Sequence, residues 1–275
     1  MSRLHCRSHP GREHRCPQQK PARPFRQRAL HECAAIAAAL SSASDPHPAI
    51  HSARKAIRRL RSLLALLEHA ALDVEAADLG LKRLGDGLSR LRDAHVVVEV
   101  ARQLQERVAD PRWNGVIRML VLRREGLLQA TLQRDPGFAR RLRVLAAVQQ
   151  QLAVQPWHQL RRGPLRQNLE RSWRRVDKAA ARAKRDGGAA AVHRWRRRVR
   201  RLRMQLDIAC DLQLHVSHSR SLHASGHRYK ALHRLSDELG RQQDLRLLRN
   251  LVRAMPASDG KRSVMQQING EVAPD

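Results

Sequence analysis

A basic motif with helical spacing occurs twice in this chain and constrains what the chain can fold into. Its pattern is H-x-x-R-[K/R]-x-x-R-R-L-R, found at residues 51–61 and again at residues 193–203. Each residue of an α-helix turns by about 100°, so the histidine and the third, seventh and tenth residues after it share one face. The opposite face holds apolar residues such as Ile57 and Val199. Each segment therefore predicts a helix that packs on one side and presents concentrated positive charge on the other.

The two charged faces are candidate binding surfaces for a polyanion. Arginine suits phosphate because its planar guanidinium can bond two phosphate oxygens and keeps its charge. Spacings of three, four and seven residues set neighbouring side chains about 5 Å apart along the helix, which matches a chain of phosphates. The candidate residues are His51, Arg54, Lys55, Arg58, Arg59 and Arg61 in the first motif, His193, Arg196, Arg197, Arg200, Arg201 and Arg203 in the second, and Arg171, Arg174, Arg175, Lys178 and Arg182 on the helix before the second motif.

The overall charge points to the same kind of partner. The chain has 54 Lys and Arg residues against 25 Asp and Glu residues, a formal net charge of +29. Such an excess attracts any polyanion, and it bears on partners rather than on the fold. No stretch approaches 18 consecutive apolar residues, so we expect no membrane span. The four cysteines form no C-x-x-C pair and no secretory signal is evident, which predicts a cytoplasmic protein with free thiols.

Helical periodicity covers most of the chain, and no alternating segment of convincing length predicts a strand. A second signature is also repeated: Leu84, Leu88 and Asp93 after the first motif recur as Leu235, Leu239 and Asp244 after the second. We therefore expect an all-α chain made of two related helical bundles that face one another. The expected helices cover about residues 25–41, 46–69, 76–109, 112–134, 138–153, 190–214 and 228–255, with a further basic helix within residues 157–185.

These two repeated signatures carry a family resemblance, because the chain resembles proteins with a CHAD domain (conserved histidine α-helical domain). The matching positions are His51 and His193 with the arginines that follow them, and the two Leu/Asp segments. The resemblance covers about residues 25–255. It implies two helical bundles with a pseudo-twofold internal repeat, binding of inorganic polyphosphate along a basic surface, and association with polyphosphate granules. Some members are fused to a triphosphate tunnel enzyme, but this chain has no strand-rich segment and no E-x-E-x-K motif.

The expected domain organisation follows from these segments. Residues 1–24 are read as a disordered basic tail, because they are rich in Arg, His and Pro. Residues 25–255 form the CHAD-like domain, with repeat one at about residues 25–153 and repeat two at about residues 157–255. Residues 256–275 are expected to be a loose C-terminal tail, which leaves open whether the second repeat has its last helix.

The function expected from the sequence is non-enzymatic binding of inorganic polyphosphate, with divalent counter-ions as possible companions, in the cytoplasm and on polyphosphate granules. The alternative is a general nucleic-acid-binding basic protein, since charge alone would suit it. Against this alternative, no zinc finger, helix-turn-helix or RRM signature is present. An enzyme acting on polyphosphate would need clustered acids with Mg²⁺, but only one carboxylate in each repeat, Asp93 and Asp244, is regular. A structural role for both is favoured, and no cofactor is expected.

Two groups of Cys and His residues could supply zinc ligands, but neither predicts a metal site. The first group has a spacing that fits no standard zinc finger, and the second reads as a polar loop that charges in acid. The four tryptophans are expected to pack in the core. The first group is Cys6, His9, His14 and Cys16; the second is His215, His218, His223 and His227; the tryptophans are Trp113, Trp157, Trp173 and Trp195.

Overall fold

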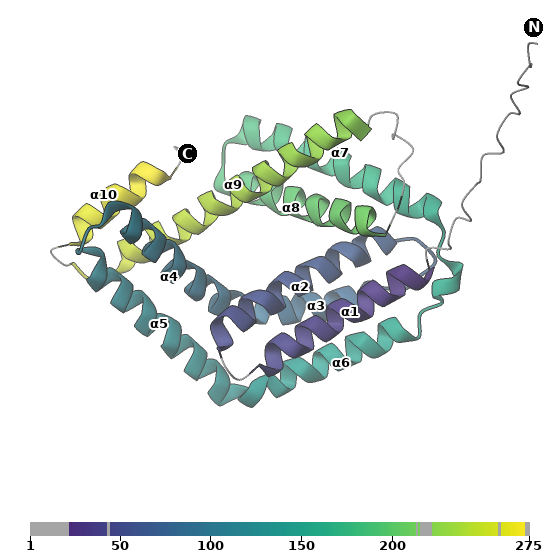
Figure 1. The fold of residues 1–275 in the computed structure, drawn as a ribbon, viewed down its shortest axis with the longest axis horizontal. Coiled ribbons are helices and arrows are strands. Elements are labelled where there is room, and N and C mark those ends of the chain that lie inside the picture. The colour runs from purple at the N-terminus through teal and green to yellow at the C-terminus, as the bar shows by residue number, and fades with distance from the viewer. Residues whose placement is uncertain (1–21, 43–44, 213, 215–221, 258–259, 273–275) are drawn as a thin grey trace, which may run out of the picture.

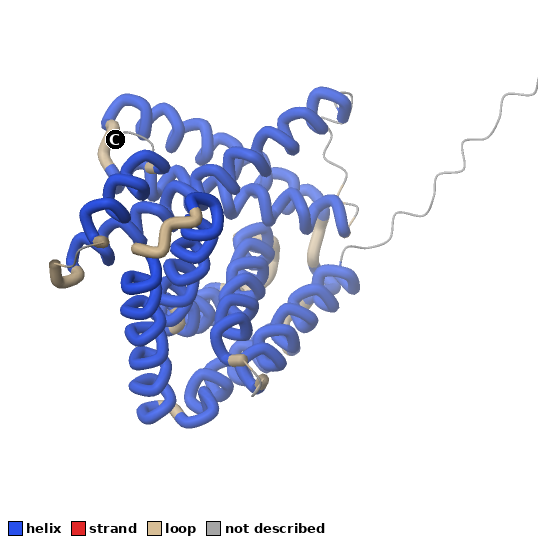
Figure 2. The backbone as a smooth tube through the Cα atoms, turned by 60° about the vertical axis from the view of Figure 1, so that its left-hand side comes forward, coloured by secondary structure: helices blue, strands red, loops and turns tan. Residues whose placement is uncertain are grey.

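The computed structural model describes residues 22–42, 45–212, 214, 222–257 and 260–272, without the side chains of residues 222–227. These residues form helices and no strand, so the all-α prediction is confirmed (Figure 2). The helices are α1 (Ala22–Ser41), α2 (Pro46–Leu67), α3 (Glu75–Gly87), α4 (Ser89–Val108), α5 (Trp113–Arg134), α6 (Ala139–Ala153), α7 (Arg162–Asp186), α8 (Ala189–Asp211), α9 (Leu222–Ala254) and α10 (Lys261–Glu271), with short 3-10 turns at Pro136–Phe138 and Trp157–Gln159.

The helix bearing the first motif begins where the sequence predicts. Asp45 caps α2, because its side chain accepts a hydrogen bond from the backbone N–H of His47 at 3.1 Å, and Pro46 occupies the first position of the helix. The long helix that bears the second Leu/Asp signature is α9. The basic helix before the second motif, α7, ends at Gly187 in the left-handed conformation. These caps set the start and end of the helices that carry the basic side chains.

One predicted helix is broken in two. Residues 76–109 form α3 and α4, which meet at Gly87 to Ser89. Two glycines, Gly85 and Gly87, weaken the helix here. The Gly85 carbonyl also accepts a hydrogen bond from the side chain of Arg54 on α2. Asp93 therefore belongs to α4, whereas Leu84 at the start of the Leu/Asp segment belongs to α3.

The interior has two apolar clusters, and each draws helices from both halves of the sequence. The first joins α1, α2, α3 and α6 to α7 and α8; the second joins α4 and α5 to α9 and α10. Figure 1 shows α7, α8 and α9 above α1, α2, α3 and α6, with α4, α5 and α10 at the left. The two halves therefore share their cores, and α8 packs directly against α2. The pseudo-twofold repeat itself stays a prediction.

The tryptophans follow the expectation that they pack. Trp113 and Trp157 are buried, and Trp173 and Trp195 are partly buried against the first cluster. Cys33 is buried and Cys210 is exposed, and both are free thiols. Cys6 and Cys16 lie outside the described residues, as does most of the predicted N-terminal tail. The start of α1 at Ala22 places residues 22–24 in a helix rather than in that tail.

The C-terminal segment is not a loose tail throughout, which corrects the prediction for residues 256–275. Residues Lys261–Glu271 form α10, and its Val264 and Ile268 are fully buried in the second cluster. The Trp113 indole N–H donates to Gln267 Oε1 at 2.6 Å, and Gln267 Nε2 donates to Asp110 at 2.7 Å. The sequence of residues 256–275 is mostly polar, so this helix was not predicted. Val264 and Ile268 nevertheless have the i, i+4 spacing of a buried stripe.

We expect Ile268→Ala to lower the free energy of unfolding by about 2–4 kcal/mol, because it leaves a cavity in a closed core. Chemical denaturation followed by circular dichroism measures this loss. Arg262→Ala is the control, since Arg262 is exposed on the same helix, and we expect it to change stability by less than about 0.5 kcal/mol. Equal stability of the Ile268 variant and the wild type would mean that α10 does not dock on the core.

Candidate functional site

A cluster of five arginines forms where α2, α8, α4 and α9 meet. Packing of α8 against α2 turns the two basic motifs toward each other, so their arginines lie near one another and near Arg92 of α4. We call this set the central cluster. The sequence suggested that the charged faces are open surfaces. Instead, Arg196 is only 8% exposed, and the two faces surround a partly buried core of positive charge. The central cluster is Arg54, Arg58, Arg92, Arg196 and Arg200.

Hydrogen bonds fix several of these side chains. Arg54 donates to Ser89 Oγ at 2.9 Å and to the Gly85 carbonyl, and Arg58 donates through Nε to the Arg54 carbonyl at 3.1 Å. Arg92 donates to both aspartates of the repeated signature, to Asp93 Oδ1 at 3.1 Å and to Asp244 Oδ1 at 3.2 Å. The cluster therefore contains five guanidinium groups and two carboxylates that pair with one of them.

The excess of positive charge disturbs the ionisation of the cluster. Burial lowers the pKa of Arg58 well below its ordinary value, and the nearby guanidinium groups of Arg92 and Arg54 lower it further. Burial and the neighbouring Arg58 lower the pKa of Arg200 more strongly still. Guanidinium groups nevertheless keep their protons at neutral pH. Folding therefore holds like charges together at a cost in stability, and a bound anion would relieve that cost.

Three cluster side chains also have donors without a partner. The Nε–H groups of Arg54, Arg92 and Arg196 are buried and have no acceptor within the described structure. Buried donors of this kind are rare, because each one forgoes the hydrogen bonds that water would supply. Together with the unbalanced charge, they mark the cluster as a place that favours an anion.

A groove of about 680 Å³ opens from this cluster between α2, α3, α7 and α8. Arg58 and Arg200 belong to both the central cluster and the groove wall, so the groove leads to the buried charge. Eight arginines and one lysine line it against a single carboxylate, that of Asp86. We call it the basic groove. Its cationic residues are Arg58, Arg61, Lys82, Arg175, Arg194, Arg197, Arg198, Arg200 and Arg201.

Comparison with known proteins identifies the fold. The sequence model of the CHAD domain matches residues 26–253. The chain belongs to the CHAD domain family. A search of curated proteins finds no match to it. Among solved structures, the chain is similar to the crystal structure of the CHAD domain from the plant Ricinus communis, at 21% identity and a TM-score of 0.65, covering 91% of this chain and 86% of that one. It is also similar to PptA from Streptomyces chartreusis, at 14% identity and a TM-score of 0.63, covering 91% and 93%.

In this CHAD domain, the structure brings together only part of the predicted site. Six of the seventeen predicted residues line the basic groove and two more, Arg54 and Arg196, complete the central cluster. Three others are tied to carboxylates elsewhere: Arg59 to Glu32 at 2.9 Å, Arg203 to Asp237 at 2.7 Å and Arg182 to Asp186 at 3.0 Å. Lys55, Arg174 and Lys178 are exposed and Arg171 is partly buried, and none of the four lines the groove.

The two motif histidines lie beside the cluster. Burial lowers the pKa of His51, and the guanidinium groups of Arg92 and Arg58 lower it further. Burial also lowers the pKa of His193, with Arg197 next in effect, although a side-chain hydrogen bond with Gln243 acts in the opposite direction. Both imidazoles are therefore biased toward the neutral form while no anion is bound.

Sequence reasoning missed Arg92, Lys82, Arg194 and Arg198. Arg92 directly precedes the Asp93 of the repeated signature, but the matching position in the second signature is Gln243, so the repeat gave no signal for it. Arg194 and Arg198 are on the second basic helix, one residue out of step with the face chosen from the motif. Because α8 carries arginine on most of its circumference, periodicity alone could not show which face lines the groove.

The two aspartates of the repeat act on the basic residues, as favoured from the sequence. Both aspartates form ion pairs with Arg92 rather than with the motif arginines. Each also raises the pKa of one motif arginine, Asp93 that of Arg54 and Asp244 that of Arg196. In both cases burial lowers the pKa by more. Each carboxylate is thus engaged by a cation in this structure.

The possible metal ligands form no site within the part of the chain that the structure describes, where no group of three or more His, Cys, Asp or Glu side chains is arranged to hold a metal ion. The first group weighed from the sequence, Cys6 to Cys16, lies outside the described residues, as do His215, His218 and the side chains of His223 and His227. Within the described residues, no helix is long and apolar enough to cross a membrane.

Proposed function

We propose that this CHAD protein binds inorganic polyphosphate in the basic groove, with the phosphates reaching the central cluster, and does not alter the bound chain. The observation that carries the proposal is the groove itself, whose lining has nine cations and one carboxylate, although Arg61 is also paired with Asp78 at 2.8 Å, and which leads to half-buried arginines of unbalanced charge. A linear polyanion supplies many closely spaced charges at once, so it can neutralise the groove and the cluster together.

Arginine at most of the cationic positions favours phosphate as the bound group. A guanidinium fork can bond two phosphate oxygens, and the charge persists at every physiological pH. The described lining residues of the groove include no aromatic side chain, so it has no aromatic platform on which successive bases could stack. These features favour polyphosphate over single-stranded nucleic acid, while the exposed cations of α7 could still attract any polyanion weakly.

The absence of catalysis is part of the proposal. Hydrolysis of a phosphoanhydride bond usually depends on clustered carboxylates that hold Mg²⁺. Here Asp93 and Asp244 pair with Arg92, and Asp86 pairs with Lys82 at 2.7 Å. Divalent cations would then accompany the polyphosphate as counter-ions rather than occupy a protein site. Residence in the cytoplasm, on polyphosphate granules, follows as a further element of the proposed function.

A titration of long-chain polyphosphate into the protein tests this directly. We expect saturable binding at roughly physiological salt, with no release of orthophosphate over hours in Mg²⁺ or Mn²⁺. Steady release of orthophosphate that persists after removal of contaminating phosphatases would contradict the non-enzymatic assignment, and lack of saturable binding would contradict the polyphosphate assignment.

Affinity for polyphosphate is expected to rise several-fold as the pH falls from about 8 to 6, because bound anions favour the charged forms of His51 and His193. Folding lowers both pKa values in the free protein, and binding raises them, so protons are taken up on binding. As the pH falls, the affinity therefore begins to rise near the pKa of the histidines in the complex. It stops rising once the pH is below their pKa in the free protein. Dissociation constants at three pH values measure it.

The control for the pH effect is the double variant His51→Gln/His193→Gln. It should bind polyphosphate with an affinity that changes little over the same pH range, because glutamine keeps a hydrogen-bonding side chain but does not titrate. An unchanged pH dependence in this variant would assign the proton uptake to other groups.

A further inference from the structure

A second cavity lies against a different side of α3 from the basic groove. Its volume is about 440 Å³, within the range of small-molecule sites, and it is an open depression lined by α3, the end of α5 and the start of α6. Lys82 and Asp86 of α3 line the basic groove, whereas Arg83 and Gly87 line this cavity, so the helix separates the two. We call it the α3–α6 cavity.

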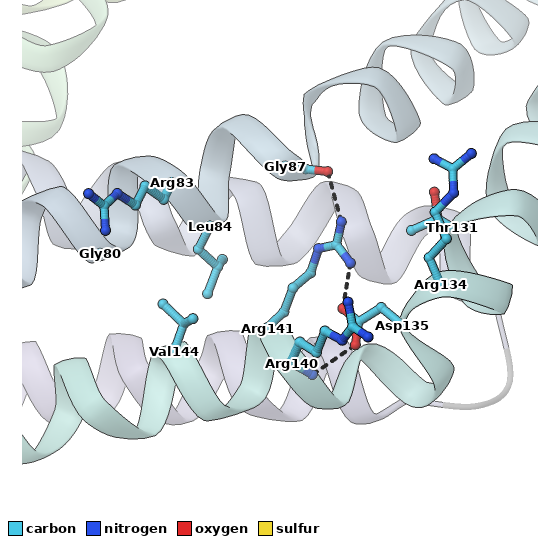
Figure 3. A pocket seen from close by; sticks show the side chains of 10 residues that line it. All are labelled: Gly80, Arg83, Leu84, Gly87, Thr131, Arg134, Asp135, Arg140, Arg141 and Val144. Atoms are coloured by element: carbon cyan, nitrogen blue, oxygen red, sulfur yellow. Dashed lines mark hydrogen bonds and ion pairs between the residues drawn. The ribbon is translucent and has the colours of Figure 1, made fainter.

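One end of the α3–α6 cavity is cationic. Arg134 at the end of α5 and Arg140 in the first turn of α6 line it, and both side chains are exposed and without an ion-pair partner among the described residues. Figure 3 shows Arg134 beside Thr131 at this end, with Arg140 next to Asp135. The carboxylate of Asp135 does not oppose an anion strongly, because it is buried and already accepts from Arg141 Nη1 at 2.5 Å and from the Arg140 backbone N–H at 2.8 Å.

The other end is apolar and is flanked by a third arginine. Val144 is 41% exposed and lies in the cavity wall with Leu84, which is only 4% exposed. Gly80 brings α3 close to α6, since a Cβ at this position would lie 2.8 Å from Val148 Cγ2. Figure 3 places Gly80 and Arg83 at this end, opposite Arg134. Arg83 is exposed and, within the described structure, has no ion-pair partner.

Between the two ends the charge of the cavity wall is nearly neutral. Arg141 crosses its middle, paired with Asp135 and donating to the Gly87 carbonyl at 3.2 Å, while its guanidinium lies 5.5 Å from the centre of the Phe138 ring. Its charge is thereby compensated. The cavity thus differs in kind from the basic groove, because it has two exposed arginines at one end, a charge-compensated middle, and apolar residues together with a third exposed arginine at the other end.

We propose that the α3–α6 cavity binds a nucleoside di- or triphosphate. Arg134 and Arg140 would receive the phosphates, and the base would lie on Val144 and Leu84 beneath the guanidinium of Arg83, which can stack on an aromatic ring. An amphipathic anion fits this division of charge better than a bare phosphate chain, which would leave the apolar end uncovered. The site is independent of the basic groove and of its polyphosphate.

Calorimetric titration of ATP, inorganic tripolyphosphate and adenosine into the full chain carrying Arg58→Met/Arg200→Met, in which the competing basic groove is weakened, tests the proposal. We expect ATP to bind at one equivalent, about tenfold or more tighter than tripolyphosphate at this site, and adenosine to bind weakly. The triple variant Arg83→Ala/Arg134→Ala/Arg140→Ala should weaken ATP binding by about 30-fold or more. The control triple variant Arg118→Ala/Arg123→Ala/Arg262→Ala removes the same charge from exposed positions on α5 and α10 and should retain ATP binding.

The basic groove is separated from this site by the double variant Arg58→Met/Arg200→Met, which should still bind ATP at one equivalent. Equal affinity for ATP and tripolyphosphate, both lost in the first triple variant, would mean that the cavity recognises phosphates alone and would overturn the nucleotide assignment. Unchanged ATP binding in that triple variant would remove the cavity as the site. Loss of ATP binding only in the groove variant would place nucleotides in the basic groove, with the polyphosphate assignment unaffected.

Discussion

Replacing Arg58 and Arg200 together with methionine is expected to weaken binding of long-chain polyphosphate by at least about 100-fold while leaving the melting temperature unchanged or higher. Both residues line the basic groove and belong to the central cluster. A hydrogen bond to a charged group is worth about 1.5–3 kcal/mol, so the loss of two such contacts amounts to about 3–6 kcal/mol of binding free energy. This corresponds to a factor of 100 or more in the dissociation constant.

The effect on stability has the opposite sign for a physical reason. Burial and neighbouring guanidinium groups lower the pKa of both arginines, which means that the folded state holds their charges unfavourably. Methionine keeps most of the aliphatic length of the side chain and removes the charge. Binding is measured by titration and stability by thermal unfolding of the same samples. A large fall in melting temperature would show that these arginines stabilise the fold, contrary to this account.

The matched control is Arg118→Met/Arg123→Met. These two arginines are exposed on α5, outside the basic groove, and their replacement removes the same net charge. We expect it to change the affinity for polyphosphate by less than about threefold, since exposed charges act weakly through solvent and salt. Equal losses in the two pairs would mean that total charge, not the groove, determines binding.

Asp244→Ala is expected to lower the free energy of unfolding by about 3 kcal/mol, because it removes a counter-charge from a cluster of guanidinium groups. Asp244 and its partner Arg92 have side chains that are 17% and 12% exposed, so solvent screens the loss poorly. For a chain of this size the melting temperature should fall by about 6–12 °C. The same change should tighten binding of polyphosphate, since one repelling carboxylate is gone.

Polyphosphate should restore much of the lost stability of this variant. A ligand present at about 100 times its dissociation constant adds about 2.7 kcal/mol to the stability of the folded state. Asp237→Ala is the control, because Asp237 is 71% exposed and its ion pair with Arg203 lies on the surface, where such pairs contribute about 0–1 kcal/mol. If the Asp237 variant lost as much stability as the Asp244 variant, the special position of Asp244 in the cluster would be refuted.

The helices could be predicted from the sequence wherever strong local signals set them. The cap at Asp45 and Pro46 and the apolar stripe through Ile57 gave α2 its start and its packing face. α10 was not predicted because only two of its residues, Val264 and Ile268, are buried, and they pack in a core built mainly by distant helices. The break between α3 and α4 lies next to the Gly85 carbonyl, which accepts from Arg54, a residue more than thirty positions away that local sequence signals do not include.

The candidate site was predictable in its chemistry but only partly in its geometry. The duplicated motif correctly indicated where positive charge gathers, and the Leu/Asp signature indicated which carboxylates accompany it. Neither pattern could show that packing of α8 against α2 would bury Arg196. Nor could either show that Arg194 and Arg198 would line the groove instead of Arg203. Those outcomes follow from the rotation of one helix against another, which the spacing of residues along a single helix does not contain.

Competition between labelled long-chain polyphosphate and duplex DNA, at matched charge concentration and roughly physiological salt, tests the central claim most directly. The basic groove leads a narrow, flexible polyanion to half-buried arginines that a duplex cannot reach. We therefore predict that excess DNA fails to displace polyphosphate from the wild-type protein. Displacement of polyphosphate by DNA in proportion to its charge would contradict this account and would make the surface a general cationic one.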